Sequence, residues 1–313
     1  MERTEAAKQV EVFTLDAFAK GEKGGNPAGV VLQADSMTVE EMQKTAAIVG
    51  FSETALLLES SVADFRARYF TPNNEVDLCG HATIAAFSVM FSQGLVGVGT
   101  YSLETKAGLL QVYVRENGDV FLSQTLPHFS ETVNKQEIAD SLRLSVDDFS
   151  TDLPLQIVST GLRDVMVPVK SKEILENIQP NFAKIIEVSK KYEVVGYHVF
   201  TLDTGIEALA SCRNFAPLYA IPEESATGTS NGALLCYLRK YGKYNPSEGD
   251  ENHAYGKGSE RTGHAGEVRF EQGHTMNQPS EIKAKLTLGM DQQVLEVQVG
   301  GATANLAVKW IQL

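Results

Sequence analysis

Two short turns, one in each half of the chain, place chemically capable side chains beside glycine. The first is residues 77–83, Asp-Leu-Cys-Gly-His-Ala-Thr, and the second is residues 225–232, Ser-Ala-Thr-Gly-Thr-Ser-Asn-Gly. Each leads into an apolar stretch, 84–91 and 233–239, that we expect to be helical. A helix N-terminus exposes unpaired N–H groups and carries partial positive charge, so each turn is a candidate seat for an anion. The pair favours two half-domains that close on one small acidic ligand.

Glu53 is a candidate for acid–base chemistry. It precedes the apolar stretch 54–58, so its carboxyl group is expected at the mouth of a buried strand, where desolvation favours the neutral form. A carboxyl group balanced between its two protonation states can both remove and return a proton. An exposed glutamate at the start of a strand is an equally good interpretation of the local sequence.

Cys79 and His81 lie two residues apart in the first turn. At a helix start this spacing is expected to point the side chains in different directions, which disfavours a thiol–imidazole pair. His81 is then either a packed or capping histidine, or a group that donates to a ligand or relays a proton. We interpret Cys79 as a small buried residue, because its counterpart in the second turn is Thr227 and a two-thiol racemase would lack one thiol.

The second turn offers backbone N–H groups and a hydroxyl at Gly228 and Thr229. Glu224 lies three residues before Thr227, where it can orient the threonine hydroxyl or the first-turn histidine, or cap the turn. A plain Ser/Thr helix cap is the alternative for this segment. Arg213 is expected either to pair with a ligand carboxylate or to form a structural ion pair with Glu224.

The composition fits a soluble globular protein, since 43% of the 313 residues are hydrophobic and 21% are charged. The length suits one large domain or two of ordinary size. The formal net charge of −13 argues against a nucleic-acid partner, which needs clustered Lys and Arg. A small anionic ligand then requires a local positive potential from backbone amides or arginine.

The cysteines, the lengths of the apolar runs and the spacing of the histidines predict the compartment of the protein and whether it binds a metal. Three cysteines without paired spacing are typical of a reducing compartment. The first 11 residues carry charges and lack an apolar core, which argues against a secretory signal. No run of about 18 apolar residues occurs, so we expect a cytoplasmic protein that does not engage a membrane. No His-Glu-x-x-His or Cys-x-x-Cys occurs, and His253, His264 and His274 are scattered, which predicts no metal site.

The elements that must position these residues follow the same order in both halves. In the first half, periodicity predicts a helix at 36–49 and strands at 10–18, 28–32, 53–58, 64–70, 100–105, 108–115 and 120–124. In the second, it predicts helices at 134–142 and 180–192 and strands at 155–159, 164–169, 194–202, 207–214, 268–272, 282–288, 294–300 and 302–311. The recurrence of strands, glycine-containing turn and buried helix indicates duplication.

This order predicts an α+β fold. No helix follows each strand in turn, and no Gly-x-Gly-x-x-Gly joins a strand to a helix, so a doubly wound nucleotide-binding fold is disfavoured. Residues 244–267 are polar and lack periodicity. A stretch of this kind inside a compact domain is expected to be a lid or an insertion.

Together these motifs resemble the phenazine-biosynthesis PhzF-like isomerase family, within the diaminopimelate-epimerase-like fold. The resemblance covers nearly the whole chain and rests on many short matches in order. The matching segments are 12–18 (Val-Phe-Thr-Leu-Asp-Ala-Phe), 25–30 (Gly-Asn-Pro-Ala-Gly-Val), 52–54 (Ser-Glu-Thr), 69–72 (Tyr-Phe-Thr-Pro), 75–83, 213–217 (Arg-Asn-Phe-Ala-Pro), 226–229 (Ala-Thr-Gly-Thr) and 271–273 (Glu-Gln-Gly).

The resemblance implies two pseudo-symmetric domains, each a curved, mostly antiparallel sheet wrapped around a central helix, with the site in the cleft between them. The N-terminal half is expected at residues 1–128, with the C-terminal strand 302–313 returning to it, and the C-terminal half at 129–301. The family also implies proton transfer in a small carboxylic acid without a cofactor or metal, usually by a homodimer.

The resemblance also assigns roles to individual residues. Glu53 stands at the family's proton-shuttling acid and His81 at its site histidine, while glycine amides and a hydroxyl hold the substrate carboxylate. The expected catalytic residues are Glu53, His81 and Glu224, and the expected substrate-binding residues are Asn26, Gly80, Gly228 and Thr229.

Three positions depart from the family's pattern. Its best-studied members have Asp where Glu224 stands and Ser where Thr229 stands, so each adds one carbon at the ligand and changes the expected shape of the substrate. Gln278 stands where Arg is usual. Two other hypotheses remain open: an epimerase that uses Cys79, and a catalytically idle member that binds small acids or a partner protein.

Overall fold

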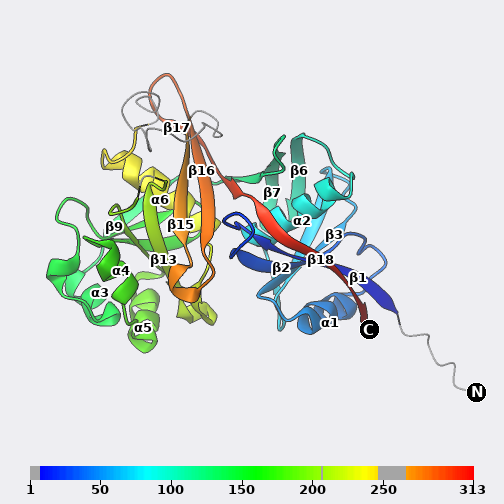
Figure 1. Cartoon of the computed structure of the whole chain (residues 1–313), viewed down its shortest axis with the longest axis horizontal. Coiled ribbons are helices and arrows are strands. Elements are labelled where there is room, and N and C mark those ends of the chain that lie inside the picture. Colours follow the sequence, from blue (N-terminus) through cyan, green and yellow to red (C-terminus); the bar gives the residue numbers. More distant parts are fainter. Residues whose placement is uncertain (1–7, 206, 246–265) are drawn as a thin grey trace, which may run out of the picture. The chain divides into compact units, whose positions relative to one another are not determined.

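The structure is a computed structural model that describes residues 8–205, 207–245 and 266–313 (Figure 1). The chain divides into two compact units. The N-terminal unit comprises Met1–Leu122 and Gly300–Leu313, and the C-terminal unit comprises Ser123–Val299. Within the described residues, every helix is too short or too polar to cross a bilayer.

The N-terminal unit contains a mostly antiparallel sheet. Its strands are β1 (Gln9–Ala17), β2 (Asn26–Val31), β3 (Glu53–Leu58), β4 (Phe65–Phe70), β5 (Glu75–Val76), β6 (Gly99–Thr105), β7 (Gly108–Val114), β8 (Val120–Gln124) and β18 (Thr303–Gln312). β18 pairs with β1 and β1 with β2, both antiparallel, whereas β2 and β3 are parallel. The pairs β3–β4, β4–β5, β6–β7 and β7–β8 are antiparallel, and β4–β6 is parallel.

Helix α2 (Gly80–Ser92) is the core of this unit. Every residue from His81 to Met90 is buried, and the helix contacts β1, β2, β3, β7 and β18. A helix that is apolar on all sides is one that protein surrounds. The other helix, α1 (Val39–Val49), buries only one face and begins at a capping box formed by Thr38 and Glu41. The sheet therefore wraps α2, which carries the first turn on its N-terminus.

The C-terminal unit is built around α6 (Gly228–Lys240), which is buried from Ser230 to Leu238. Its strands are β9 (His128–Thr132), β10 (Gln156–Ser159), β11 (Arg163–Pro168), β12 (Gly196–Thr201), β13 (Ala210–Ala216), β14 (Ile221–Glu224), β15 (Glu267–Gln272), β16 (Ser280–Leu288) and β17 (Val294–Gly301). Its other helices are α3 (Lys135–Leu142), α4 (Lys172–Asn177) and α5 (Phe182–Tyr192). Ile138 of α3 and Ile185 of α5 join one apolar cluster with Tyr197 of the sheet.

The two units repeat one pattern of strand pairing. From β1 to β7 the senses are antiparallel for β1–β2, parallel for β2–β3, antiparallel for β3–β4 and β4–β5, parallel for β4–β6 and antiparallel for β6–β7. The same order holds for β10–β11, β11–β12, β12–β13, β13–β14, β13–β15 and β15–β16. The central helix follows β5 in one unit and β14 in the other. This supports the predicted duplication.

Several predicted elements differ at their ends. Both central helices begin earlier than expected, at Gly80 and Gly228, because the turns themselves form the first helical turn. β2 begins at Asn26, two residues before the predicted strand 28–32. The short elements β5, β9, β14 and α4 were not predicted. Of the segment predicted as a lid or insertion, 246–265 lie outside the described residues.

Candidate functional site

The imidazole of His81 is the centre of the candidate site in the N-terminal unit. Its Nε2 lies 3.3 Å from Oε2 of Glu53 and 3.4 Å from Oγ of Ser52. Its Nδ1 lies 3.4 Å from Nδ2 of Asn26 and 3.4 Å from Sγ of Cys79. Three of the predicted site residues, Asn26, Glu53 and His81, are thus neighbours, and they come from β2, β3 and α2.

The sheet explains why Asn26 and Glu53 meet. The parallel register of β2 and β3 pairs Ala28 with Glu53, so the N-terminal ends of both strands lie together. Gly50 ends α1 with φ 74°, a conformation that glycine adopts freely, and returns the chain to β3. Residues 54–57 of β3 are buried, and the Glu53 side chain is 14% exposed. Its carboxyl group lies at the mouth of a buried strand, as predicted.

The expectation that Cys79 and His81 point in different directions is wrong. Cys79 precedes α2 with φ −140° and ψ 115°, and residues two apart in an extended chain share a side. Their Sγ and Nδ1 atoms therefore approach to 3.4 Å. Cys79 is small and 7% exposed, as its interpretation as a buried residue requires, but it is also a direct neighbour of the imidazole.

The His81 imidazole is in its neutral form. Burial lowers its pKa, and the neighbouring Glu53 carboxylate opposes that shift. A neutral imidazole has one N–H donor and one acceptor nitrogen, and its partners decide which is which. Donation from Nε2 to the Glu53 carboxylate leaves Nδ1 to accept from the Asn26 amide. This tautomer satisfies both partners.

The first turn of α2 has no side-chain cap from its N-cap residue. The Cys79 side chain makes no capping hydrogen bond, and Thr83 is the first residue whose N–H joins the helical ladder, through the Cys79 carbonyl. The N–H groups of Gly80, His81 and Ala82 therefore precede the ladder. This is the partially positive helix end that the prediction for Gly80 requires.

In the C-terminal unit, Glu224 orients the hydroxyl of Thr227, which is one of its predicted roles. Thr227 Oγ1 donates to Glu224 Oε2 at 2.9 Å. Thr227 precedes α6 but makes no side-chain capping bond, so the plain helix-cap interpretation is wrong. Thr160 Oγ1 donates to the Thr229 carbonyl at 3.0 Å. Glu224, Gly228 and Thr229 thus lie at the start of α6.

Gln272, at the end of β15, holds this second turn together. Its Oε1 accepts from the Thr227 N–H at 3.3 Å and from Asn231 Nδ2 at 3.0 Å. Its Nε2 donates to the Glu224 carbonyl at 2.8 Å and to Thr227 Oγ1 at 3.0 Å. The side chain is fully buried. One amide therefore binds the residues on both sides of the turn.

The backbone geometry at position 273 explains why the segment Glu271-Gln272-Gly273 ends in glycine. The residue has φ 82°, and a Cβ atom there would collide with the carbonyl oxygens of Gln278 and Ser225. The chain can therefore pass close to the second turn only with glycine at this position.

A buried polar network extends from α6 into the sheet. Ser230 Oγ donates to Asp164 Oδ2 at 2.5 Å, and Asn214 Nδ2 donates to Ser230 Oγ at 3.2 Å. The two ring nitrogens of His198 lie 3.3 Å from Asn214 Nδ2 and 3.3 Å from Asn231 Oδ1. Such a network fixes the rotation of α6 and with it the position of Gly228 and Thr229.

Burial sets the charge state within this network. It raises the pKa of Asp164, and it lowers the pKa of His198 from 6.5 to about 4. His198 is therefore neutral at neutral pH, and both of its ring nitrogens lie beside amide groups of the neighbouring asparagines.

Arg213 binds groups of its own unit. Its Nε and Nη2 pair with Glu223 at 2.8 and 2.9 Å, and Nη1 donates to the carbonyls of Leu175 and Ile178. Arg213 therefore forms a structural ion pair, but the expected partner Glu224 is wrong, because the pair is with Glu223.

The remaining cysteines are also buried. Cys212 lies in β13 and Cys236 in α6, and neither is exposed. Burial raises the pKa of Cys212 well above its ordinary value and that of Cys236 to about 12. Both are therefore unreactive thiols.

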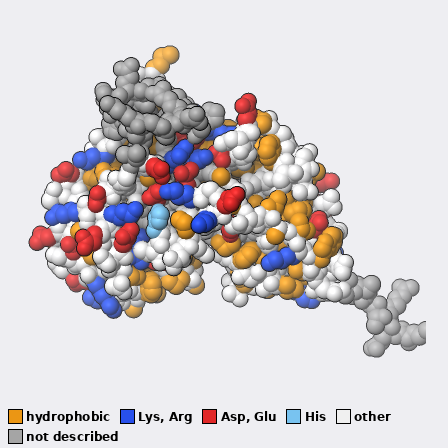
Figure 2. Space-filling model, in the orientation of Figure 1, with side chains coloured by type: hydrophobic (Ala, Val, Ile, Leu, Met, Phe, Trp, Pro, Cys, Tyr) orange, Lys and Arg blue, Asp and Glu red, His pale blue; other side chains and the backbone are white. Residues whose placement is uncertain are grey.

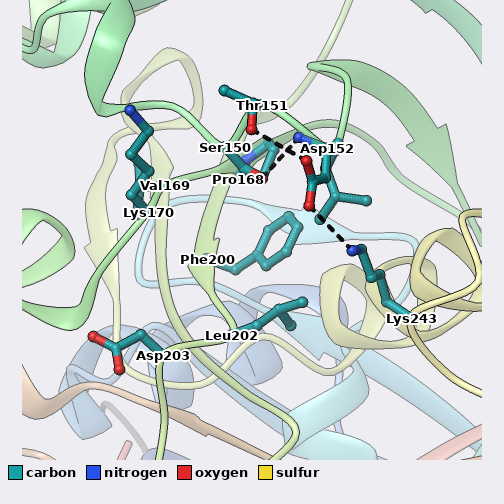
Figure 3. A pocket seen from close by; sticks show the side chains of 11 residues that line it. Ser150, Thr151, Asp152, Pro168, Val169, Lys170, Phe200, Leu202, Asp203 and Lys243 are labelled. Carbon is teal, nitrogen blue, oxygen red and sulfur yellow. Dashed lines mark hydrogen bonds and ion pairs between the residues drawn. The ribbon is translucent and has the colours of Figure 1, made fainter.

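Two surface cavities lie apart from these residues. One, of about 200 Å³, is lined by Phe200, Leu202 and Lys243 among others, and Lys243 lies 3.6 Å from Asp152 (Figure 3). The other, of about 430 Å³, lies in the N-terminal unit over Leu57 and Met90. Neither is lined by a residue predicted for the site.

Comparison with known proteins gives a consistent family. A family model described as phenazine biosynthesis-like protein (PhzC-PhzF) matches residues 15–308. The Bacillus subtilis protein named uncharacterized isomerase YfhB is 38% identical over 242 residues, which cover 75% of this chain and 83% of that protein. An uncharacterized isomerase of Deinococcus radiodurans is 36% identical over 295 residues, covering 92% and 90%.

Solved structures agree in fold. A Bacillus anthracis phenazine biosynthesis protein of the PhzF family aligns with a TM-score of 0.83 at 32% identity, covering 98% of this chain and 100% of that one. A hydroxyproline epimerase from Agrobacterium vitis aligns with a TM-score of 0.59 at 13% identity, covering 99% and 93%. The second likeness is one of fold alone. The predicted diaminopimelate-epimerase-like fold is thereby confirmed.

Proposed function

Because the chain belongs to the phenazine biosynthesis-like (PhzC-PhzF) family, we propose that it is a cofactor-independent isomerase that shifts a proton between carbons of a small carboxylic acid. Glu53 is the acid–base residue. The observation that carries this proposal is the contact of 3.3 Å between Glu53 Oε2 and His81 Nε2, at the uncapped N-terminus of α2.

The reaction begins with Glu53 as a carboxylate. It takes a proton from a carbon of the substrate, and the electron pair of the broken C–H bond moves into the conjugated system and onto the substrate carboxylate. The protonated Glu53 then returns the proton to a different carbon. No electron is gained or lost overall, so this step needs no redox partner.

His81 positions this carboxyl group. The neutral ring donates from Nε2 to Glu53, and Asn26 fixes its orientation through Nδ1. Such a donor holds one carboxylate oxygen and leaves the other for the substrate. The N–H groups at Gly80 stabilise negative charge that develops on the substrate, an effect of about 3 kcal/mol per donor in other enzymes.

Gly228 and Thr229 are proposed to bind a carboxylate of the substrate, and Glu224 is proposed to assist by orienting the Thr227 hydroxyl beside them. The start of α6 has N–H groups that no N-cap side chain satisfies, and Gln272 and Glu224 fix Thr227 beside them. The added carbons of Glu224 and Thr229 are expected to change which acid fits.

The test is exchange of substrate hydrogen with solvent. Purified protein is incubated in D2O with a panel of small cyclic and unsaturated carboxylic acids, and mass spectrometry and NMR locate any deuterium. We expect incorporation at two carbons of one acid. Tight binding of an acid without exchange would contradict the proposal and favour the catalytically idle alternative.

A Cys79-assisted epimerase is the second candidate, and the distance of 3.4 Å from Cys79 Sγ to His81 Nδ1 favours it. A thiolate beside an imidazole can act as a base at carbon. The substitution Cys79→Ala separates the two candidates. Full turnover in this variant excludes the epimerase, whereas loss of turnover with Glu53→Gln still active would replace Glu53 by Cys79.

A further inference from the structure

We propose that an arginine–glutamate ion pair in each unit positions the start of that unit's central helix for the substrate. The pairs are Arg68–Glu75, ahead of α2, and Arg213–Glu223, ahead of α6. Their effect on the reaction rests on the function proposed above. Their equivalence and their hold on the two helix starts rest on the contacts within each unit.

Strand pairing makes the two ion pairs equivalent. Tyr69 of β4 pairs with Val76 of β5 in the N-terminal unit. Asn214 of β13 pairs with Glu224 of β14 in the C-terminal unit. In each unit, the arginine and the glutamate of the ion pair directly precede these two partners in the chain. The ion pairs therefore occupy the same place in the repeat of strand pairing.

Both ion pairs have the same two-bonded geometry. Nε and Nη2 of Arg68 lie 2.7 and 2.9 Å from the two carboxylate oxygens of Glu75. The same atoms of Arg213 lie 2.8 and 2.9 Å from those of Glu223. The exposed fractions of the four side chains range from 8% to 17%. A shielded pair with two parallel bonds fixes direction as well as distance, which an exposed ion pair does not.

A phenylalanine two residues after each arginine ties the pair to the core. The guanidinium carbon of Arg68 lies 5.2 Å from the ring centroid of Phe70. That of Arg213 lies 4.9 Å from the ring centroid of Phe215. Both rings are buried, and a cation is attracted to an aromatic face. Each arginine therefore links a core ring to the glutamate ahead of the helix.

Each glutamate lies five positions before the glycine that begins its central helix, Gly80 or Gly228. Few backbone hydrogen bonds hold this segment, since β5 has two residues and β14 has four. The residue before the glycine differs in chemical class, Cys79 in one half and Thr227 in the other. The halves therefore share the means of holding a helix start and differ in the chemistry beside it.

The two pairs are expected to affect different kinetic constants. In the proposed reaction, the N–H groups at Gly80 stabilise charge that develops in the transition state, so their displacement lowers kcat. Gly228 and Thr229 bind a carboxylate of the substrate, so their displacement raises KM. A misplacement of about 1 Å can cost about 100-fold. A merely structural role would not divide the two constants between the two pairs.

Lysine variants test this division, because lysine keeps the charge but not the two parallel bonds of arginine. Their kinetics are measured by deuterium exchange with the acid that the wild type exchanges. We expect Arg68→Lys to lower kcat about 10–100-fold with KM little changed, and Arg213→Lys to raise KM by a similar factor with kcat little changed. Glu75→Gln and Glu223→Gln should each reproduce the result of their partner.

Arginines of more exposed ion pairs in the same sheets are the matched controls. Arg66 of β4 lies 3.6 Å from Glu104. Arg269 of β15, a strand that pairs with β13, lies 3.8 Å from Glu281. We expect Arg66→Lys and Arg269→Lys to keep the kinetic constants of the wild type. Effects in these controls as large as those in the test variants overturn the proposal.

Backbone hydrogen exchange, followed by mass spectrometry without substrate, tests the positioning itself. The helical ladders begin with the N–H groups of Thr83 in α2 and Asn231 in α6. We expect peptides that contain Thr83 to exchange faster in Arg68→Lys, and those that contain Asn231 to exchange faster in Arg213→Lys, with the other helix unchanged. Unchanged exchange at both helix starts, or loss of the fold in both variants of a pair, overturns the proposal.

The positioning role and the isomerase can fail separately. If the wild type exchanges no acid but hydrogen exchange at the helix starts changes as expected, the isomerase fails and the ion pairs keep their positioning role. If the wild type exchanges an acid and the folded lysine variants keep its kcat and KM, or change both constants alike, the positioning role fails and the isomerase stands.

Discussion

Among single residues, the proposed proton transfer depends most on His81 and the groups around its ring. Sequence reasoning found Glu53 and His81 from their local motifs, and Asn26 from the family resemblance alone. It misjudged Cys79, since the helix start was placed too late and the extended conformation before it was not anticipated. Ser52 was missed as a neighbour of the ring, although it stands in the motif Ser52-Glu53-Thr54.

Gln272 is the residue whose role sequence could least reveal. It lies 45 positions from Thr227 in the chain, yet it binds that residue twice. Its motif, Glu271-Gln272-Gly273, was noted only as part of a family resemblance. Contacts between distant segments depend on the register of the sheet, which one sequence does not specify.

We expect Gln272→Ala to disturb the second turn. The change removes the acceptor of the half-buried Thr227 N–H and one of the two acceptors of the buried Asn231 amide, at about 1–3 kcal/mol for a buried group left unsatisfied. Urea unfolding should show this loss, and KM for the substrate should rise more than kcat falls. Gln278→Ala, at an exposed glutamine nearby, is the control. Equal stability of the two variants would show that Gln272 does not hold the turn.

At the scale of the element, the two central helices organise both units. Their apolar sequences identified them as buried helices, and the glycine turns marked their starts to within a few residues. The strands of six residues or more were also predicted, although their ends differ by a few residues. β14 was missed although β10, of equal length, was predicted, because β14 contains a proline and two glutamates, which are rare in strands.

The network around α6 predicts a pH dependence of stability. The pKa of His198 is 6.5 in the unfolded chain and about 4 when folded. As pH falls below 6.5, the unfolded chain therefore binds a proton that the folded protein does not, and stability falls by up to about 1.4 kcal/mol per pH unit. Asp164, whose pKa burial raises, acts in the opposite direction because its folded form takes up a proton first.

Urea unfolding at pH 7 and pH 5 measures this effect. We expect the wild type to lose up to about 2 kcal/mol more than His198→Gln between these pH values. His81, whose pKa burial also lowers, contributes equally to both proteins and cancels in the difference. His128→Gln, at an exposed histidine in the same unit, should behave like the wild type. Parallel losses in the wild type and His198→Gln would contradict the assignment.

At the scale of the whole molecule, duplication is the feature that sequence indicated and the strand pairing supports. The halves share too little identity for their sequences to prove it, yet the order and sense of six strand pairs repeat. Backbone pairing tolerates substitution far better than side-chain identity does, which is why the fold records the repeat more clearly.

The proposed homodimer gives a prediction at this scale. Apolar side chains gather on the face of the N-terminal unit that Figure 2 shows, and those of β18 include Leu306, Val308 and Trp310, the last 63% exposed. A charge at such a position opposes association of two copies. By light scattering, we expect the wild type at twice the chain mass of 34.1 kDa and Trp310→Glu at that mass. Leu295→Glu, on the other unit, is the control; a monomeric wild type contradicts the proposal.

The central claim, that Glu53 moves the proton, is tested most directly by the rate of deuterium incorporation from D2O into the substrate. Glu53→Gln keeps the size of the side chain and the fold but removes the base, so incorporation should fall at least about 100-fold. Glu59→Gln, just beyond the other end of β3, should exchange like the wild type. Incorporation at an undiminished rate in a folded Glu53→Gln protein would contradict the account.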